Sequence, residues 1–504
     1  MPLDVADRTR LQPFVSNLDR NVFALFGLPE EVIAVLFAYY SRSRDDLRTN
    51  LARLLADQSL AIGGTGSPCQ DALAKAKDKA ASFHDKWVVG YGHSSVAEHA
   101  TVHLAIENVS IVASKVIEDL RLGAFTEKST RYVVFDTKSF ADLPNLPDDL
   151  RATYQQSCAQ LFTTYLGLFP KLDEKLRKAL PRRDNQSEQA YASVIRSHCC
   201  DLLRGLLPAS TLTNIGLSAN ARALGFLINK MLSSPLNEVQ QVAADMHKEA
   251  LSVSPTLLRH VEPNSHRIDV RDRAAANLIT TLHPTMKPSS QQGVKILRFD
   301  TDALARIAIA LAFDVGPATD AQSIESSIQS IDTDTLTRLV LDAMSSRGPH
   351  DPAPRAFEAS SITVELELDY GAFRDLQRHR MLSPFTQLLG CSIGAGVPEE
   401  LQQLELASEY QSALDIAHEA WTKLAAHDAH SAQYAVPLAF RVRCLWTLNL
   451  REAFHVIELR SSKQGHASYR RVAQQLYGAL CEVHPWLGSL IRVNMNDYAL
   501  ARDL

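Results

Sequence analysis

The sequence predicts an α+β protein with two domains, and three observations support this. At 504 residues the chain is long enough for two or three hydrophobic cores. Residues 101–109 and 362–370 have the apolar or alternating pattern of strands. Amphipathic stretches at 221–250, 401–427 and 468–482 predict long helices. We expect one helix-backed sheet in each domain, with the helix after each of the two strands carrying an arginine-bearing segment.

Two segments have the pattern of domain openings. Residues 28–43 predict a helix, because a proline and two acidic residues precede an apolar face. Residues 294–314 predict a strand, a turn at 300–302 and a second apolar helix. Prolines and serines at 261–292 predict a linker with a short helix at 270–282. The expected domains are therefore 1–260 and 293–504.

Composition excludes several classes of function. The formal net charge of −5 offers no field for a nucleic-acid polymer, so a free nucleotide is the better expectation. Neither long apolar run can span a bilayer, and the acidic start does not resemble a signal peptide, so no membrane partner is expected. Seven cysteines without a Cys-x-x-Cys pair predict a cytoplasmic protein and no metal site.

The two halves share a register, which predicts an internal duplication. A constant offset across several residues is stronger evidence than any single match. The second half is about thirty residues shorter, and residues 154–203, expected to be helical, carry the extra length. The offset is 259 for Arg121 and Arg380, and 229 for Pro208 and Pro437, Asn220 and Asn449, and Arg222 and Arg451.

A basic run and a histidine motif are candidate binding elements. Arg378, His379 and Arg380 place three potential cations in a row, and phosphates are natural partners for them. Without context, a solvated basic helix end is the alternative. His93, Ser95 and Glu98 follow a glycine-rich turn, where a capping box at a helix start is the alternative. Their counterparts at offset 259 are Pro352, Pro354 and Phe357, so we expect the second copy to be lost.

Three further strings contain candidate site residues. Ser129 and Arg131 lie in Ser-Thr-Arg-Tyr, and Arg204 opens Arg-Gly-Leu-Leu-Pro. Asn449 is followed by His455 after six residues and by Arg460 after eleven. Taken alone, the Ser-x-Arg-Tyr string is more often structural. Asn449, with Arg451 and Glu452, predicts a helix-cap network when it is taken alone.

Together these strings resemble the sequence blocks of the flavin-dependent thymidylate synthases. That family's signature joins Arg-His-Arg-x-x-Ser to Ser-x-Arg-Tyr within fourteen residues, whereas here the two pieces lie in different halves. The chain therefore resembles two such domains in tandem. The second half departs from the signature at Phe385, Leu388, Gly390 and Cys391, and the first at Asp119, Leu120, Arg121, Ala124 and Thr126.

The resemblance assigns roles to the matching residues. It implies that the nucleotide is held by Ser129, Arg131, Arg204 and Arg460, of which Ser129, Arg131 and Arg460 are the candidate catalytic residues. It implies that the flavin is held by His93, Ser95, Glu98, Arg378, His379, Arg380, Asn449 and His455. The two halves thus keep complementary sets. Family sites lie between subunits of a homotetramer, so we expect a homodimer that forms a pseudo-tetramer of domains, with sites shared between divergent domains.

The activity implied by the resemblance is methylation of dUMP to dTMP. It requires FAD, with NADPH and methylenetetrahydrofolate as co-substrates. Two alternatives remain open at this point. The altered positions Ala124, Thr126 and Phe385 are compatible with another pyrimidine nucleotide as substrate. Because neither half has a complete signature, a non-catalytic flavin- or nucleotide-binding protein is the other.

Overall fold

The computed structural model describes residues 5–27, 44–56, 97–98, 100–282 and 293–497. The helix predicted at 28–43 and the site residues His93 and Ser95 lie outside the described residues. The chain forms two compact units, each discontinuous in sequence. The first unit comprises Met1–Pro170, Leu207–Pro288 and Asp415–Val436, and the second comprises Lys171–Leu206, Ser289–Leu414 and Pro437–Leu504. The predicted boundaries 1–260 and 293–504 stay a prediction about the duplicated sequence, because each unit includes a segment from the other half.

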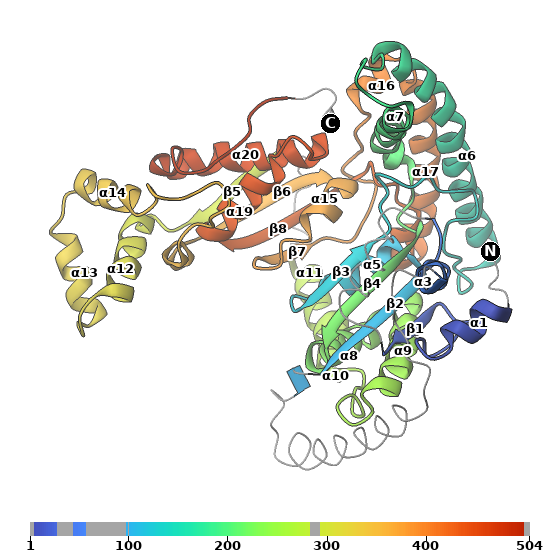
Figure 1. The fold of residues 1–504 in the computed structure, drawn as a ribbon, viewed down its shortest axis with the longest axis horizontal. Coiled ribbons are helices and arrows are strands. Elements are labelled where there is room, and N and C mark those ends of the chain that lie inside the picture. Colours follow the sequence, from blue (N-terminus) through green and yellow to red (C-terminus); the bar gives the residue numbers. More distant parts are fainter. Residues whose placement is uncertain (1–4, 28–43, 57–96, 99, 283–292, 498–504) are drawn as a thin grey trace. The chain divides into compact units, whose positions relative to one another are not determined.

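The first unit contains an antiparallel sheet in the order β1-β2-β4-β3. Its strands are β1 (Val22–Leu25), β2 (Thr101–Ser110), β3 (Gly123–Glu127) and β4 (Leu212–Asn220), so the strand predicted at 101–109 is confirmed. Helices α8 (Ala221–Leu232) and α9 (Asn237–Val253) pack against this sheet (Figure 1). Shorter helices are α1 (Val5–Leu11), α3 (Leu47–Ala56), α5 (Ile111–Glu118) and α18 (Ala429–Ala432).

The second unit repeats this topology with the order β5-β6-β8-β7. Its strands are β5 (Gly293–Phe299), β6 (Ser361–Asp369), β7 (Ser383–Thr386) and β8 (Arg441–Asn449), which confirms the strand predicted at 362–370. Helices α19 (Leu450–Arg460) and α20 (Ala467–Val483) pack together, and α20 covers β5 and β6 (Figure 1). Two sheets of identical order, each backed by helices, agree with the predicted α+β class.

Strand pairing confirms the register of the duplication and explains one shift in it. Ala124 pairs with Ser218 in the first sheet, and Ser383 pairs with Thr447 in the second, as offsets of 259 and 229 require. Thr101 pairs with Asn220 and Ser361 with Asn449, which requires an offset of 260. The difference of one residue is a β-bulge in β2 between Ile106 and Val109, where Asn108 has a φ of 55°.

The long helices are present, but two of them are interrupted. The helical character predicted for 154–203 is confirmed by α6 (Asp148–Ala179) and α7 (Glu188–Leu203). The helix predicted at 221–250 is instead two helices, because Pro235 lies between α8 and α9 and cannot continue the hydrogen-bond ladder. The helix predicted at 401–427 is divided into α16 (Glu399–Gln403) and α17 (Ala407–His427), with Glu405 at a φ of 56° between them.

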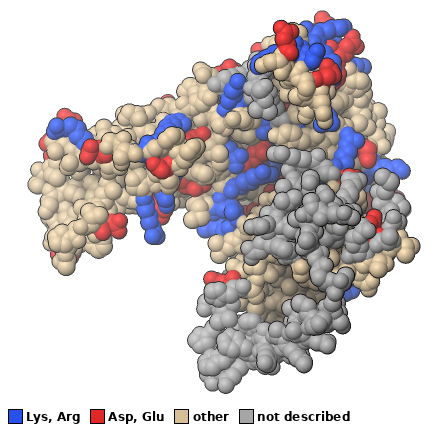
Figure 2. Space-filling model, viewed as in Figure 1, with Lys and Arg blue, Asp and Glu red and all other residues tan. Residues whose placement is uncertain are grey.

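The remaining elements lie mostly at the surface. The short helix predicted at 270–282 is confirmed by a helical run of α10 (Ser265–Asp269), a π-helical segment at Val270–Ala275 and α11 (Ala276–Leu282). The strand and helix predicted at 294–314 are β5 and α12 (Ala303–Val315), which α13 (Ala321–Gln329) and α14 (Thr333–Asp342) follow. Figure 2 shows few charged side chains over α12–α14, where Phe313, Val315 and Leu339 are exposed. Helical turns at Arg204–Leu206, Arg355–Ala359, Gln433–Ala435 and Pro485–Leu487, with helix α15 (Tyr370–Leu376), complete the fold.

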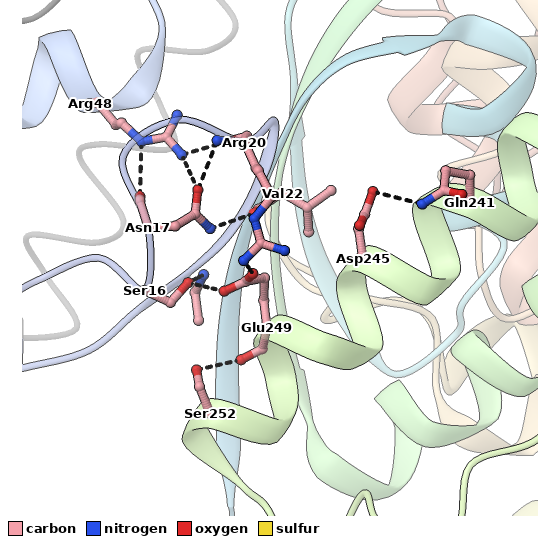
Figure 3. Close-up of polar contacts among 10 residues, drawn as sticks. Ser16, Asn17, Arg20, Val22, Arg48, Gln241, Asp245, Glu249 and Ser252 are labelled. Atoms are coloured by element: carbon pink, nitrogen blue, oxygen red, sulfur yellow. Dashed lines mark hydrogen bonds and ion pairs between the residues drawn. The ribbon is translucent and has the colours of Figure 1, made fainter.

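A polar network fixes the amino-terminal segment of the first unit (Figure 3). The Glu249 carboxylate of α9 accepts hydrogen bonds from the Ser16 hydroxyl and the Arg20 guanidinium. Arg48 is buried, donates to the Arg20 carbonyl at 2.6 Å, and lies 3.7 Å from the centre of the Phe23 ring. These charge-assisted bonds join the loop before β1 to both α3 and α9.

Other findings concern cysteines, metals and membranes. The six described cysteines are free thiols, and five of them are buried. Within the described residues, no cluster of three or more His, Cys, Asp or Glu side chains is arranged to hold a metal ion. A search of the same residues finds no helix with the length and apolarity to cross a bilayer.

Candidate functional site

Arg204 is held in the second unit at the end of α7. Ser187 caps the start of this helix, and Arg204 follows its last residue. The side chain is only 4% exposed, and its Nη1 donates to Asp375 Oδ2 at 3.2 Å. Its Nη2 is also buried, and within the described part of the chain it has no hydrogen-bond partner. A buried donor without a partner is costly, so this atom suits an acceptor group on a ligand.

Arg460 is the last residue of α19, in the same unit. Asn449 caps this helix by accepting a hydrogen bond from the Glu452 amide at 2.8 Å, which confirms the predicted cap. Arg460 Nε donates to His379 Nε2 at 2.8 Å, and the guanidinium lies 5.6 Å from the centre of the Tyr469 ring. Burial lowers the pKa of Arg460, Asp375 and Tyr469 raise it, and Arg378 lowers it. The guanidinium nevertheless stays protonated at neutral pH.

His379 connects Arg460 to a buried carboxylate. Its Nδ1 is 3.0 Å from Glu452 Oε1, while its Nε2 accepts the hydrogen bond from Arg460. An acceptor at Nε2 places the proton of the neutral ring on Nδ1, where it donates to Glu452. Burial is the largest influence on His379 and lowers its pKa, although the hydrogen bond to Glu452 opposes this. The ring is therefore neutral at physiological pH.

The other residues predicted to hold the flavin differ in exposure. The basic run at 378–380 follows α15 instead of lying on it, since α15 ends at Leu376 and Gln377 caps it. Arg378 is exposed and Arg380 is half-buried. His455 is exposed on α19, with its ring centre 5.1 Å from that of His379. Two arginines and an exposed imidazole thus lie around the buried His379.

Asp375 is the common anion of this arrangement. Its carboxylate is paired with Arg204 and also raises the pKa of Arg460. Sequence reasoning missed Asp375, which lies in α15, two residues before the cap Gln377. It also missed Tyr469 and the role of Glu452. Of these, only Glu452 had a usable signal, because it lies three residues after the helix cap Asn449.

A cavity of about 360 Å³ lies beside Arg204 in the second unit. Among the described members of the predicted set, Arg204 alone lines it, and Asp369, Arg441, Ser468 and Arg470 contribute further polar groups. Desolvation raises the pKa of the half-buried Asp369, and the Arg204 charge opposes that shift. The lining carries both signs of charge, so it indicates no particular ligand.

The remaining predicted residues lie in the first unit. Ser129 Oγ accepts a hydrogen bond from the Arg131 amide at 3.2 Å, and both side chains are half-buried. Glu98 forms an ion pair with Arg222 at 2.6 Å. The structure thus brings Arg204, the basic run, Asn449, His455 and Arg460 into one unit, and it leaves Ser129, Arg131 and Glu98 in the other.

The expectation that Glu98 has no glutamate counterpart in the second half is wrong. The bulge in β2 changes the offset before it to 260, which pairs Glu98 with Glu358 and not with Phe357. Glu358 forms an ion pair with Arg451 at 2.7 Å, just as Glu98 does with Arg222. At the same offset, the counterparts of His93 and Ser95 are Ala353 and Arg355.

Two matches to a family model decide the relationship. A model described as thymidylate synthase complementing protein matches residues 37–256 and 295–486. The chain belongs to this family. Each matched segment contains the central strand pair of one sheet, β2 with β4 or β6 with β8. The family assignment therefore applies to both halves of the chain, as the duplication requires.

The chain is also similar to individual proteins. A UPF0159 protein of Chlamydia muridarum is 33% identical, and the match covers 98% of this chain and 96% of that protein. A UPF0159 protein of Thermoplasma acidophilum is 31% identical, with 83% and 90% covered. A flavin-dependent thymidylate synthase of Thermococcus kodakarensis is 27% identical over 36% of this chain and 66% of its own length. Similarity to proteins named as synthases thus covers a smaller share of the chain.

Proposed function

We propose that this protein is a flavin-dependent thymidylate synthase that methylates dUMP and has its working nucleotide site in the second unit. The observation that supports this most directly is the shared environment of Arg204 and Arg460. One comes from the first half of the sequence and the other from the second. Within one compact unit, Arg204 pairs with Asp375, and the Asp375 charge raises the pKa of Arg460. The family relationship supports the same activity.

The buried Arg204 and the half-buried Arg460 suit a pyrimidine nucleotide. Arg204 has an unpartnered donor, and a phosphate or carbonyl oxygen would satisfy it. A guanidinium held near a uracil carbonyl stabilises negative charge that develops as the ring is activated. Partial burial strengthens that effect, because the surrounding dielectric is lower than in water. Ser129 and Arg131 lie in the first unit, so on the family pattern we propose that they reach the nucleotide from the other chain of a homodimer.

The residues around His379 suit a flavin cofactor. Exposed Arg378 and half-buried Arg380 offer donors to a pyrophosphate, and exposed His455 offers an aromatic edge beside them. Asn449 keeps its side-chain amino group for a ligand, because the cap uses its oxygen. FAD would supply the redox chemistry, with NADPH as reductant and methylenetetrahydrofolate as carbon source. The protein would contribute binding, orientation and exclusion of water.

The proposal is tested by Arg460→Ala, with dUMP binding measured by calorimetry and dTMP formation by product analysis. Loss of one charge-assisted contact costs about 1.5–3 kcal/mol, which is roughly a ten- to hundredfold loss of affinity. Leu459→Ala is the matched control, because Leu459 is the exposed neighbour on the same helix. Unchanged affinity and turnover in Arg460→Ala would remove Arg460 from the site.

The purified protein also distinguishes an enzyme from a non-catalytic relative. A flavin spectrum close to stoichiometry that NADPH bleaches supports the synthase proposal. A colourless protein that gains no flavin on incubation with FAD contradicts it. Competition among dUMP, UMP and dCMP then identifies the substrate, and exclusive formation of dTMP excludes another pyrimidine as the natural substrate.

We also propose a homodimer. The face of α12–α14 seen in Figure 2 has few charged side chains, and exposed Phe313, Val315 and Leu339 on these helices are typical of a protein interface. A solution mass of about twice 55.7 kDa by light scattering is the expected result. A monomeric mass at micromolar concentration would contradict the proposal.

A further inference from the structure

Two consecutive hydrogen bonds connect the start of α19 to its end. Glu452, in the first turn, accepts from His379 Nδ1, and His379 Nε2 accepts from Arg460 Nε. The histidine side chain is 1% exposed and the glutamate side chain 8%. Both are held at the backbone as well, because the Glu452 amide donates to Asn449 and the His379 amide donates to the Leu376 carbonyl. The connection is therefore built from fixed groups.

This arrangement restricts the orientation of Arg460. A guanidinium has five N–H donors in one plane, one at Nε and four at the terminal nitrogens. Since Nε is engaged by His379, the Nε edge of the group is directed at that ring, and the edge between the two terminal nitrogens is turned away from it. The contact with the Tyr469 ring limits the same group from another side.

We propose that Glu452 and His379 are positioning residues, which hold Arg460 by its Nε atom so that its terminal nitrogens meet the nucleotide. This inference rests on the proposed function for the role of Arg460 itself. It assigns His379 a role other than the flavin contact expected from the family pattern, and it gives Glu452 a role beyond the helix cap.

The charges around His379 agree with this role. The titratable groups that face the ring are Glu452, His455 and Arg460. Burial keeps the imidazole neutral, which Nε2 requires in order to accept a hydrogen bond from a cation. A protonated ring would place an N–H group against the Arg460 N–H and break the connection.

The first unit shows that the fold does not require these three side chains. Leu120, Ala223 and Met231 occupy the positions equivalent to His379, Glu452 and Arg460. The sheet order and the Asn220 cap of α8 are retained there without them. Ala223 and Met231 are simply buried in the core. Apolar side chains can thus replace Glu452, His379 and Arg460 without loss of the fold. These buried polar groups are better explained by function than by stability.

The first experiment measures the orientation of Arg460 without a ligand. In protein labelled with ¹⁵N-arginine, the Arg460 Nε–H signal, assigned from Arg460→Lys, should exchange slowly with solvent. His379→Leu and Glu452→Leu should abolish that protection, whereas Glu452→Gln should keep it, because the amide oxygen still accepts from Nδ1. His103→Leu, in the other unit, is the control for loss of a hydrogen-bonded histidine. Melting curves establish that each variant is folded.

The second experiment is a double-mutant cycle on dUMP affinity. If His379 acts through Arg460, His379→Leu weakens binding about tenfold, and it adds nothing in an Arg460→Ala background. Additive losses would overturn the positioning role, as would an Arg460 signal that exchanges fast in the wild type or is indifferent to the variants. A protected signal in a protein that does not bind dUMP would leave the connection standing and refute the proposed function instead.

Discussion

The two units have the same sheet order but opposite chemistry at equivalent positions. The second unit has Arg204, Arg378, His379 and Arg460, whereas the first unit has Gln433, Asp119, Leu120 and Met231 at those positions. In the first unit Asp119 pairs with Lys230, and Gln433 Nε2 donates to the His430 carbonyl at 3.1 Å. One unit therefore gathers the cations and the other has satisfied or apolar replacements.

This difference shows that the motif residues kept by the two halves of the sequence are grouped by unit in the folded chain. Each unit combines the sheet of one half with the Arg204 or Gln433 segment of the other half. A motif residue that changes in one half of the sequence therefore affects the unit that is built mainly from the other half. The comparison predicts one working arginine site for each chain, and each experiment below tests it.

The largest effect is expected from Arg204→Ala. Removing this buried arginine also breaks its ion pair with Asp375, so we expect a loss of dUMP affinity of about a hundredfold or more. Gln433→Ala is the matched control at the equivalent position of the first unit, and it should leave affinity unchanged. Calorimetry measures both. Equal losses in the two variants would show that the units share the work.

The second prediction concerns stoichiometry. Calorimetric titration should give about one dUMP per chain, since the first unit lacks equivalents of Arg204 and Arg460. Flavin absorbance per chain should likewise correspond to about one cofactor. A count of two nucleotides per chain would require a second site that uses other residues, and it would break the comparison.

The third prediction is a pH dependence that His379 of the second unit contributes. His379 is neutral and its pKa is lowered by burial, whereas an unfolded histidine titrates near about 6.5. Below that pH this histidine is protonated in the unfolded chain but stays neutral in the folded chain, so the free energy of unfolding falls as pH falls. His379→Gln should show a smaller acid-induced loss in urea titrations. Leu120→Gln, at the equivalent position, should titrate like the wild type.

The smallest effect is expected from the paired ions that both units retain. The side chains of both ion pairs, Glu98 with Arg222 and Glu358 with Arg451, are more than a third exposed. Each pair therefore contributes at most about 1 kcal/mol to the free energy of unfolding. Glu98→Gln and Glu358→Gln should therefore change the free energy of unfolding little and equally. Flavin content should fall only in Glu98→Gln. A fall in both variants would mean that the second copy also serves the cofactor.

Much of the fold could be predicted from local patterns. The alternation in 362–370 produced β6, and the opening at 294–314 produced β5 and α12, because these segments express their own periodicity. The interruption of 221–250 was predictable in principle from Pro235, which amphipathicity alone ignores. The bulge at Asn108 was not, because one extra residue in a strand becomes visible only when its partner strand is placed.

The sequence by itself determined the duplication, the family blocks and which half kept each motif residue, since these are properties of residue identity and spacing. Tertiary structure decided which of the retained residues meet. Arg204 and Arg460 lie 256 positions apart, and only the exchange of segments between the units places both near Asp375. It also gave His379 its neighbours, because a hydrogen bond depends on where two side chains end and not on the motif to which either belongs.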